Sequence, residues 1–200
     1  MTESSDEIDG RRLRREQNRE LVLDALGELF AEGNLTPTTR QIADRAGLSM
    51  RSLVRYFDDF DDLLRSAIGR GECLALPHLD VEIDPNLATT ERITALIEAR
   101  LAAVEAIAPF ARAGRVAAHR QPIIRERMAR SRAFLRDQMV RVLSPELEQA
   151  DGSMLAVMDV LLSFESFELL AGVNELSSPD IVRALAQAVE GLLLQIPVAR

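Results

Sequence analysis

The stretch from Thr36 to Phe57, TPTTRQIADRAGLSMRSLVRYF, constrains the fold more than any other part of the sequence. Thr38, with Gln41 three residues later, matches a capping box at the start of a helix. Gly47 marks the end of that helix, because a residue without a Cβ takes positive φ at little cost. Ser49 can then cap a second short helix. The pattern is typical of a helix-turn-helix, in which two short helices meet at a tight turn.

Apolar residues give each of these two helices one inner face. The first helix carries Ile42, Ala43 and Ala46, and the second carries Leu53, Tyr56 and Phe57. Spacings of three and four residues place such side chains on one side of a helix. We also predict a helix before the pair, from Arg19 to Glu32, and one after it that starts at about Asp59. These helices are expected to share one small core.

Four tracts in a fixed order carry a resemblance to a known family: RQIA at 40–43, AGLS at 46–49, LVRYF at 53–57 and LL at 63–64. From about residue 14 to 68 the chain resembles the DNA-binding domain of the tetracycline-repressor (TetR) family of bacterial one-component regulators. Beyond about Gly71 it resembles that family only in length and helical layout. The resemblance implies a dimeric transcriptional repressor that a small ligand releases from a palindromic double-stranded DNA operator.

The net charge of −8 is unusual for a DNA-binding protein, but the charges are unevenly distributed. Between Arg11 and Phe57 there are nine arginines and six acids, whereas from Gly71 onward there are 13 arginines and 18 acids. DNA phosphates are attracted by the first part and repelled by the second. The arginines at 11, 12, 14 and 15 form either a basic arm that reaches the DNA or the solvated start of a helix.

Four carboxylates directly follow the basic part of the chain: Asp58, Asp59, Asp61 and Asp62. Negative side chains are favoured at the N-terminus of a helix. We therefore interpret this cluster as the acidic start of the next helix rather than as a regulatory element.

The rest of the chain has one helical pattern after another and no strand alternation. We predict breaks at Gly69, Gly71, Pro77 and 84–86, and helices over 89–107, 110–119, 122–143, 153–173 and 179–196, with Pro109 ending the first of these. The predicted fold is all-α. A flexible arm (1–13) precedes a three-helix helix-turn-helix domain (14–68, with the motif at about 38–57), and a larger helical domain follows (72–200).

The last two predicted helices are apolar around most of their circumference, as in MLAVMDVLLSFESFELLAGV. Such helices must be buried on most sides. The family resemblance implies that they pair with their copies in a homodimer, and that the C-terminal domain also binds the ligand. The alternative is that they form the core of a monomeric bundle. We favour the dimer, because a helix-turn-helix of this kind binds two half-sites.

The resemblance places the helix from Ser49 to Phe57 in the major groove. Arg51 and Arg55 can donate to guanine, and Met50 and Val54 can contact thymine methyl groups. Phosphate contacts are expected near the start of the preceding helix. The predicted DNA-binding residues are Thr38, Thr39, Arg40, Ser49, Met50, Arg51, Val54, Arg55 and Tyr56.

Two positions depart from the family pattern. Val54 stands where the recognition helix usually has tyrosine, and Phe60 stands where the next helix usually begins with lysine. Both family residues are normally phosphate contacts. Their replacement puts those contacts in doubt and keeps open a second interpretation, a protein-interaction module with a decayed helix-turn-helix.

Polar residues among apolar ones are the candidates for the ligand site. They are Glu98, Arg115, His119, Glu165 and Ser166. Each has an ordinary structural interpretation as well, as a solvated, capping or dimer-contact residue. The abundance of Leu, Ala, Val and Met predicts an apolar pocket and an apolar or amphipathic ligand.

Several other classes of protein have no support in the sequence. An enzyme is not expected, because the chain lacks catalytic motifs and its two histidines have no metal-ligand spacing, so we predict no catalytic residues, no metal and no cofactor. The single cysteine, Cys73, is expected to be a small buried apolar residue. No run reaches the about 18 apolar residues of a membrane span. The acidic start has no signal segment. We therefore expect a cytoplasmic location.

Overall fold

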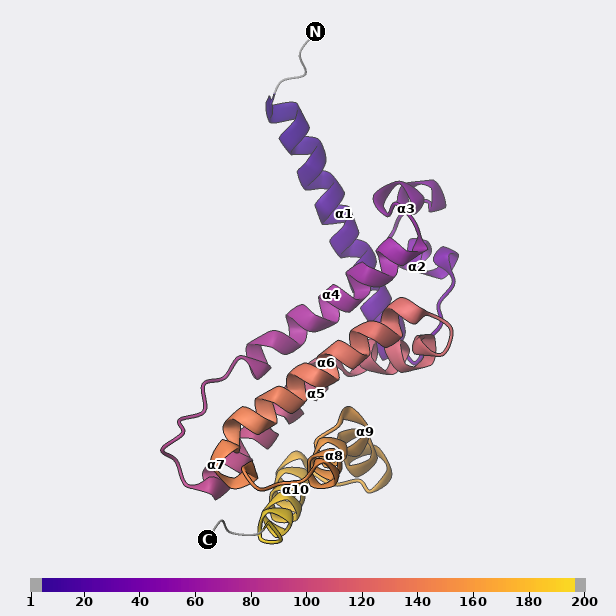
Figure 1. Cartoon of the computed structure of the whole chain (residues 1–200). Coiled ribbons are helices and arrows are strands. Elements are labelled where there is room, and N and C mark those ends of the chain that lie inside the picture. Colours follow the sequence, from indigo (N-terminus) through magenta and orange to yellow (C-terminus); the bar gives the residue numbers. More distant parts are fainter. Residues whose placement is uncertain (1–4, 197–200) are drawn as a thin grey trace. The chain divides into compact units, whose positions relative to one another are not determined.

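The computed structural model describes residues 5–196, and within them the chain is all-α, with no strand. The helices are α1 (Ser5–Ala31), α2 (Thr39–Arg45), α3 (Met50–Tyr56), α4 (Phe60–Leu79), α5 (Thr89–Ala118), α6 (Pro122–Val142), α7 (Ser144–Leu147), α8 (Gly152–Leu161), α9 (Phe164–Glu168), the π-helix η1 (Leu169–Val173) and α10 (Ser178–Leu193) (Figure 1). The predicted all-α fold is confirmed.

The chain forms two compact units. The N-terminal unit contains the chain up to Cys73 together with Ile107–Arg127, and the C-terminal unit contains Leu74–Ala106 and the residues from Met128 on. The division therefore falls inside α4, α5 and α6. The segment 107–127, which we placed in the C-terminal domain from the sequence, packs with the helix-turn-helix instead.

The core of the N-terminal unit is formed by α1, α2, α3 and the start of α4. Its buried residues are Val22, Leu23, Leu26, Leu29, Ile42, Ala43, Leu53, Tyr56, Phe57 and Leu63. Phe110 of α5 joins them through an edge-to-face contact with Phe30, with ring centroids 5.6 Å apart. Gly27 makes room for this ring, because a Cβ there would lie 3.0 Å from the Phe110 Cζ atom.

The first helix is longer than the predicted Arg19–Glu32. It begins at Ser5, so the stretch that we predicted to be a flexible arm is helical from residue 5 on, and residues 1–4 of that arm lie outside the described residues. The side chains of Arg12, Arg14 and Arg15 are exposed on this helix. Of the two interpretations of these arginines, a flexible basic arm and a solvated helix start, the structure has the helix start.

Four predicted helix breaks are wrong. Gly69, Gly71 and Pro77 all lie inside α4, and α5 continues through Pro109. Gly71 is buried beside Phe110, and a Cβ there would make an ordinary contact with Phe110 Cβ at 3.6 Å. Around Pro109, the buried residues Ala108 and Ala113 keep the chain packed as a helix although proline removes one hydrogen bond.

The predicted helix 153–173 is divided into three elements. Ser163 begins α9, its side chain accepts a hydrogen bond from the Ser166 amide, and η1 then extends the segment as a π-helix. Arg100, which is 2% exposed, donates from Nη1 to the Leu162 carbonyl oxygen over 3.3 Å and from Nη2 to the Leu135 carbonyl oxygen. Burial lowers the pKa of Arg100 to about 10, so it stays charged at neutral pH and stabilises the end of α8.

The core of the C-terminal unit is larger. Its buried residues are Ile93, Leu96, Ile97, Leu101, Met139, Leu143, Leu147, Met158, Leu162, Phe167, Ile181, Leu185, Ala186 and Val189. They come from α5 to α10, so most helices of this unit contribute one apolar face. Cys73 belongs to neither core: it is exposed on α4, and the prediction of a buried cysteine is wrong.

Candidate nucleic-acid interface

The start of α2 has the predicted capping box. Thr38 Oγ1 accepts a hydrogen bond from the Gln41 amide at 3.3 Å, and the Gln41 side-chain oxygen accepts from the Thr38 amide at 2.8 Å. These two bonds satisfy backbone donors that a helix start leaves without an intrahelical partner. They fix the direction in which α2 leaves the loop after α1.

The corner between the two helices depends on Gly47. Its φ is +68°, and the following amide, that of Leu48, donates back to the Ala43 carbonyl oxygen at 2.9 Å. Ser49 then caps α3 by accepting from the Ser52 amide at 3.1 Å. The turn and the α3 cap therefore depend on Gly47 and Ser49, two residues that the sequence predicted for these roles.

The recognition helix α3 has one buried and one exposed face. Leu53 is 4% and Tyr56 9% exposed, and Phe57 follows directly at 3%. The opposite side carries four exposed side chains, as predicted: Met50, Arg51, Val54 and Arg55. The helix is thus held by its inner face and offers two cations and two apolar groups to a binding partner.

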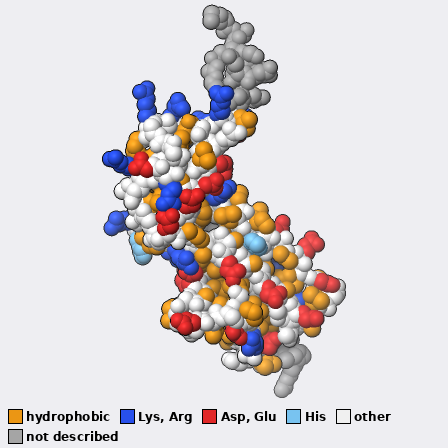
Figure 2. Space-filling view, turned by 180° about the vertical axis from the view of Figure 1, so that it is seen from behind, with side chains coloured by type: hydrophobic (Ala, Val, Ile, Leu, Met, Phe, Trp, Pro, Cys, Tyr) orange, Lys and Arg blue, Asp and Glu red, His pale blue; other side chains and the backbone are white. Residues whose placement is uncertain are grey.

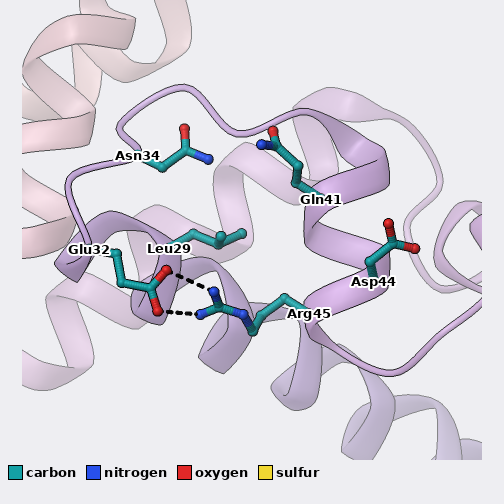
Figure 3. Close-up of a pocket in the computed structure, with 6 residues that line it drawn as sticks. All are labelled: Leu29, Glu32, Asn34, Gln41, Asp44 and Arg45. Carbon is teal, nitrogen blue, oxygen red and sulfur yellow. Dashed lines mark hydrogen bonds and ion pairs between the residues drawn. The ribbon is translucent and has the colours of Figure 1, made fainter.

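The arginines of this unit differ in how far they are already paired. Arg45 forms two hydrogen bonds with Glu32, at 2.9 and 2.7 Å, in a shallow depression lined by Leu29, Glu32, Asn34, Gln41, Asp44 and Arg45 (Figure 3). Arg40 is exposed and 3.7 Å from Asp44. Within the described part of the chain, Arg51 has no ion-pair partner. Arg51 and Arg40 are thus less engaged with acidic side chains than Arg45 is.

On the face shown in Figure 2, arginine side chains gather over the N-terminal unit, whereas hydrophobic and acidic side chains are prominent over the C-terminal unit. The segment between Arg11 and Phe57, which contains α2 and α3, has nine arginines and six acids. A polyanion is therefore attracted to the part of the surface that carries α3.

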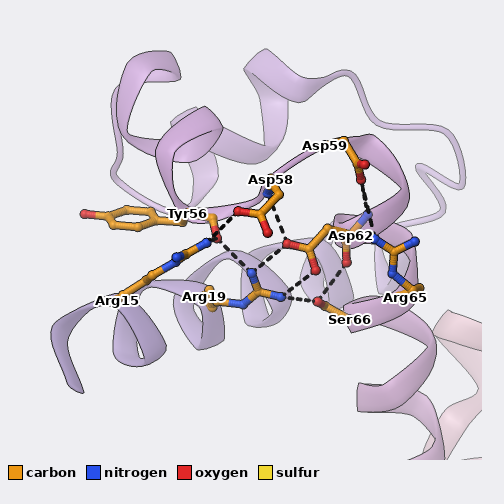
Figure 4. A network of polar contacts seen from close by, with 8 residues as sticks. All are labelled: Arg15, Arg19, Tyr56, Asp58, Asp59, Asp62, Arg65 and Ser66. Atoms are coloured by element: carbon orange, nitrogen blue, oxygen red, sulfur yellow. Dashed lines mark hydrogen bonds and ion pairs between the residues drawn. The ribbon is translucent and has the colours of Figure 1, made fainter. Parts of the chain in front are cut away.

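The acidic cluster at 58–62 has structural partners. Asp59 caps α4 by accepting from the Asp62 amide at 2.6 Å, and Asp58 pairs with Arg15 at 2.9 Å. Asp62 accepts two hydrogen bonds from Arg19, which, with its other contacts, lowers the pKa of this carboxyl to about 2 (Figure 4). Interpretation of the cluster as the acidic start of a helix agrees with these contacts.

Comparison with known proteins decides the family. The family model of the bacterial regulatory proteins of the tetR family matches residues 22–67, the segment that contains α2, α3 and their shared core. This segment is a DNA-binding domain of the TetR family. The chain is a DNA-binding regulatory protein.

One solved structure similar to this TetR-family chain is the crystal structure of a transcriptional regulator from Rhodococcus sp. Rha1. The identity is 20%, the TM-score is 0.70, and the match covers 91% of this chain and 99% of that chain. At this identity the likeness shows a shared fold across both units. No curated protein matches the chain in sequence.

The two departures from the TetR-family pattern are both exposed. The side chain of Val54 is 64% and that of Phe60 55% exposed. Neither can donate a hydrogen bond to a phosphate. An interface of this TetR-family domain with DNA must therefore take its polar contacts from other side chains, such as Arg51 of α3 and Arg40 of α2.

The five ligand-site candidates do not form one group. Arg115 and His119 lie in the N-terminal unit, whereas Glu98, Glu165 and Ser166 lie in the C-terminal unit. Glu165 pairs with Arg132 at 2.9 Å, and Ser166 donates to the Val160 carbonyl oxygen at 2.6 Å. Glu98 and His119 are exposed. None of the five lines the depression of Figure 3.

Sequence reasoning missed Arg19 as a functional candidate and considered Arg15 only as part of a basic arm or a solvated helix start. Both donate to the Tyr56 carbonyl oxygen, 41 and 37 residues away in the chain. No local spacing signals such a contact. Among the described residues no cluster of metal-ligating side chains occurs, and no described helix is long and apolar enough to cross a membrane.

Proposed function

We propose that this protein is a homodimeric transcriptional repressor that leaves its palindromic operator when a small, mostly apolar ligand binds the C-terminal helices. One observation carries the DNA-binding part of the proposal: α3 is fixed by a buried inner face and exposes Met50, Arg51, Val54 and Arg55. The mode of regulation, repression with release by a ligand, is supported by the family alone.

Each exposed residue has a role in this proposal. Arg51 donates to the O6 and N7 atoms of a guanine, and Met50 and Val54 contact thymine methyl groups. Phosphates are contacted from the start of α2 and from the α3 cap, by Thr38, Thr39, Arg40 and Ser49. Arg55 and Tyr56 lie at the C-terminal end of α3, where Arg15 and Arg19 of α1 donate to the Tyr56 carbonyl oxygen.

A homodimer is supported by apolar side chains left exposed in the C-terminal unit. Val157 and Val160 of α8 are 48% and 64% exposed, and Leu169 and Val173 of the π-helix are 57% and 72% exposed. A large contiguous apolar surface marks an interaction site in soluble proteins. A second copy of the chain is the partner that a palindromic operator requires, because each copy reads one half-site.

Charge substitution on α8 tests the dimer. We expect Val160→Glu to give a monomer in sedimentation equilibrium, since a carboxylate would be buried at the interface without a partner. Val116→Glu is the matched control, because Val116 is an exposed valine of α5 in the N-terminal unit. A Val160→Glu protein that stays dimeric would place the interface elsewhere.

The DNA-binding part is tested by titrating the purified protein with its own upstream region and with a scrambled duplex at two salt concentrations. We expect tight binding to one sequence and a steep salt dependence. Equal, weak binding to both duplexes would favour the second candidate, a protein-interaction module, for which the exposed Val54 and Phe60 are the specific observation.

The ligand is tested on the protein bound to its operator. Addition of apolar and amphipathic compounds is expected to release the DNA, since an effector shifts the equilibrium only by its difference in affinity for the two states. A compound that raises the unfolding temperature without releasing DNA binds both states equally. Release by none of them would remove the support for an effector of this class.

A further inference from the structure

Arg19 connects three helices through one guanidinium group. Its Nη1 atom donates to the Tyr56 carbonyl oxygen and to Asp62 Oδ2, both at 2.8 Å. Its Nη2 atom donates to Asp62 Oδ1 at 3.0 Å and to Ser66 Oγ at 2.6 Å (Figure 4). Arg19 belongs to α1, Tyr56 is the last residue of α3, and Asp62 and Ser66 belong to the first turns of α4.

The position of the Tyr56 carbonyl explains why this contact matters. The last carbonyl groups of a helix have no intrahelical partner. Arg19 supplies a charged donor to one of them, and its guanidinium carbon also lies 4.4 Å from the centre of the Phe57 ring. The end of the recognition helix is therefore held from α1 by a cation that α4 keeps in place.

The pair is mostly shielded from solvent and already neutralised. The side chain of Arg19 is 24% exposed and that of Asp62 is 17% exposed. The four Nη–H groups of Arg19 are all engaged with Asp62, Tyr56 and Ser66, so only the Nε–H group is left for a phosphate. Arg19 thus belongs to the basic N-terminal part of the chain without being one of its free cations.

We propose that Arg19 and Asp62 are positioning residues for operator reading, and that they act by fixing the C-terminal end of α3 rather than by touching DNA. The proposal rests on the proposed DNA-binding function. It gives Asp62 a favourable role in DNA binding, whereas its negative charge alone would repel DNA.

The substitution Asp62→Asn separates the two effects. It removes a negative charge close to the DNA-binding helix, so electrostatics alone predicts tighter operator binding. Positioning predicts the opposite, because the two-bond pair with Arg19 is lost. We expect at least a tenfold loss of operator affinity. Asp61→Asn is the matched control, because Asp61 lies in the same turn and is exposed. It is expected to bind the operator as tightly as the unchanged protein, or more tightly.

Arg19 is tested by the slope of affinity against salt. Each phosphate contact contributes about 0.9 to the slope of log K against log salt concentration. If Arg19 only positions α3, Arg19→Gln and Arg19→Lys both weaken operator binding with the slope unchanged, because lysine cannot form the two-bond pair. A slope lowered by about 0.9 in Arg19→Gln and retained in Arg19→Lys would make Arg19 a phosphate contact and overturn the proposal.

The double variant Arg19→Gln/Asp62→Asn adds a test of the pair as a unit. Residues that act through one interaction give non-additive effects. We expect the double variant to bind the operator no more weakly than the weaker single variant. If the fold losses of operator affinity in the two single variants multiply in the double variant, Arg19 and Asp62 contribute independently.

A measurement without DNA keeps this inference separate from the proposed function. Hydrogen exchange of the α3 backbone amides is expected to be faster in Asp62→Asn than in Asp61→Asn, while the amides of α10 are unchanged. If the unchanged protein binds no DNA specifically, the proposed function fails, yet the exchange result still decides the positioning role. Equal α3 exchange in both variants, or operator binding in Asp62→Asn as tight as in Asp61→Asn, would overturn it.

Discussion

Arg55 donates a hydrogen bond from Nη2 to the hydroxyl oxygen of Tyr56 over 3.1 Å. Its guanidinium carbon lies 5.2 Å from the centre of the same ring. The two arginines on the outer face of α3 are therefore not equivalent: Arg55 is engaged with its neighbour, whereas Arg51 has no ion-pair partner among the described residues. We therefore expect Arg51 to contact a DNA base more readily than Arg55.

Arg51→Ala is expected to weaken operator binding by about 1–3 kcal/mol, or about 5- to 150-fold, and to relax the preference at one base pair. Arg55→Ala should have a smaller effect on that preference, because Arg55 must leave Tyr56 to reach a base. Fluorescence anisotropy with single-base operator variants measures both. Arg183→Ala, far along the chain on α10, is the control. An unchanged base preference in Arg51→Ala would mean that other side chains of α3 contact the bases.

Arg40→Ala is expected to affect all DNA sequences alike. Its side chain is 84% exposed, and its contact with Asp44 is a long one at 3.7 Å, so it can turn toward a phosphate. Loss of one phosphate contact lowers the slope of log K against log salt concentration by about 0.9. Titrations of operator and scrambled duplex over a salt series give this slope. A loss confined to the operator would instead assign Arg40 to a base contact.

Asp62 gives the fold a defined pH dependence. Its pKa is lowered from 3.8 to about 2, chiefly by the hydrogen bonds from Arg19. The carboxylate therefore stabilises the folded state above pH 3.8 and loses that effect as the pH falls through about 2. The full contribution is about 2 kcal/mol, and about half of it remains at pH 3.

Urea unfolding of the unchanged protein and of Asp62→Asn, from pH 7 to pH 3, tests this. The difference in unfolding free energy between the two should be greatest at pH 7 and should shrink toward pH 3. Because both proteins share all other titrating groups, the difference reports on Asp62. A difference that is the same at both ends of the range would show that the Arg19 pair does not lower the pKa of Asp62.

Gly47→Ala is expected to destabilise the protein by about 1 kcal/mol or more, because a residue with a Cβ is strained at positive φ. Nothing lies within 4 Å of the added Cβ, so the cost is one of backbone conformation and not of packing. Gly69→Ala is the matched control: it lies in α4, also has open space, and should stabilise by up to about 1 kcal/mol. Thermal unfolding of both variants measures the contrast, and equal shifts would refute it.

The parts of the fold that the sequence predicts best are those fixed by neighbours in the chain. Thr38, Gln41, Gly47 and Ser49 satisfy or release backbone groups within four positions of themselves, so their pattern is sufficient. The all-α class follows from helical spacing alone. The exposed face of α3 follows from the same spacing, since Leu53 and Tyr56 define its buried side.

What the sequence does not reveal depends on partners far along the chain. Gly71 lies within a helix and is buried beside Phe110, and α5 continues through Pro109 with Ala108 and Ala113 buried on either side. The pair of Arg19 with Asp62 spans 43 positions, and that of Arg45 with Glu32 spans 13. An arginine count alone therefore overstates the positive charge available to DNA.

The exposed Cys73 provides a single attachment point for a spectroscopic probe. It is the only thiol in the chain, and it lies on α4, the helix whose Asp62 pairs with Arg19 of α1. A nitroxide label there would mark each copy once, without any engineered cysteine. In a homodimer, electron paramagnetic resonance would then yield one label-to-label distance. That distance would show directly whether an effector changes the separation of the two α4 helices while DNA is released.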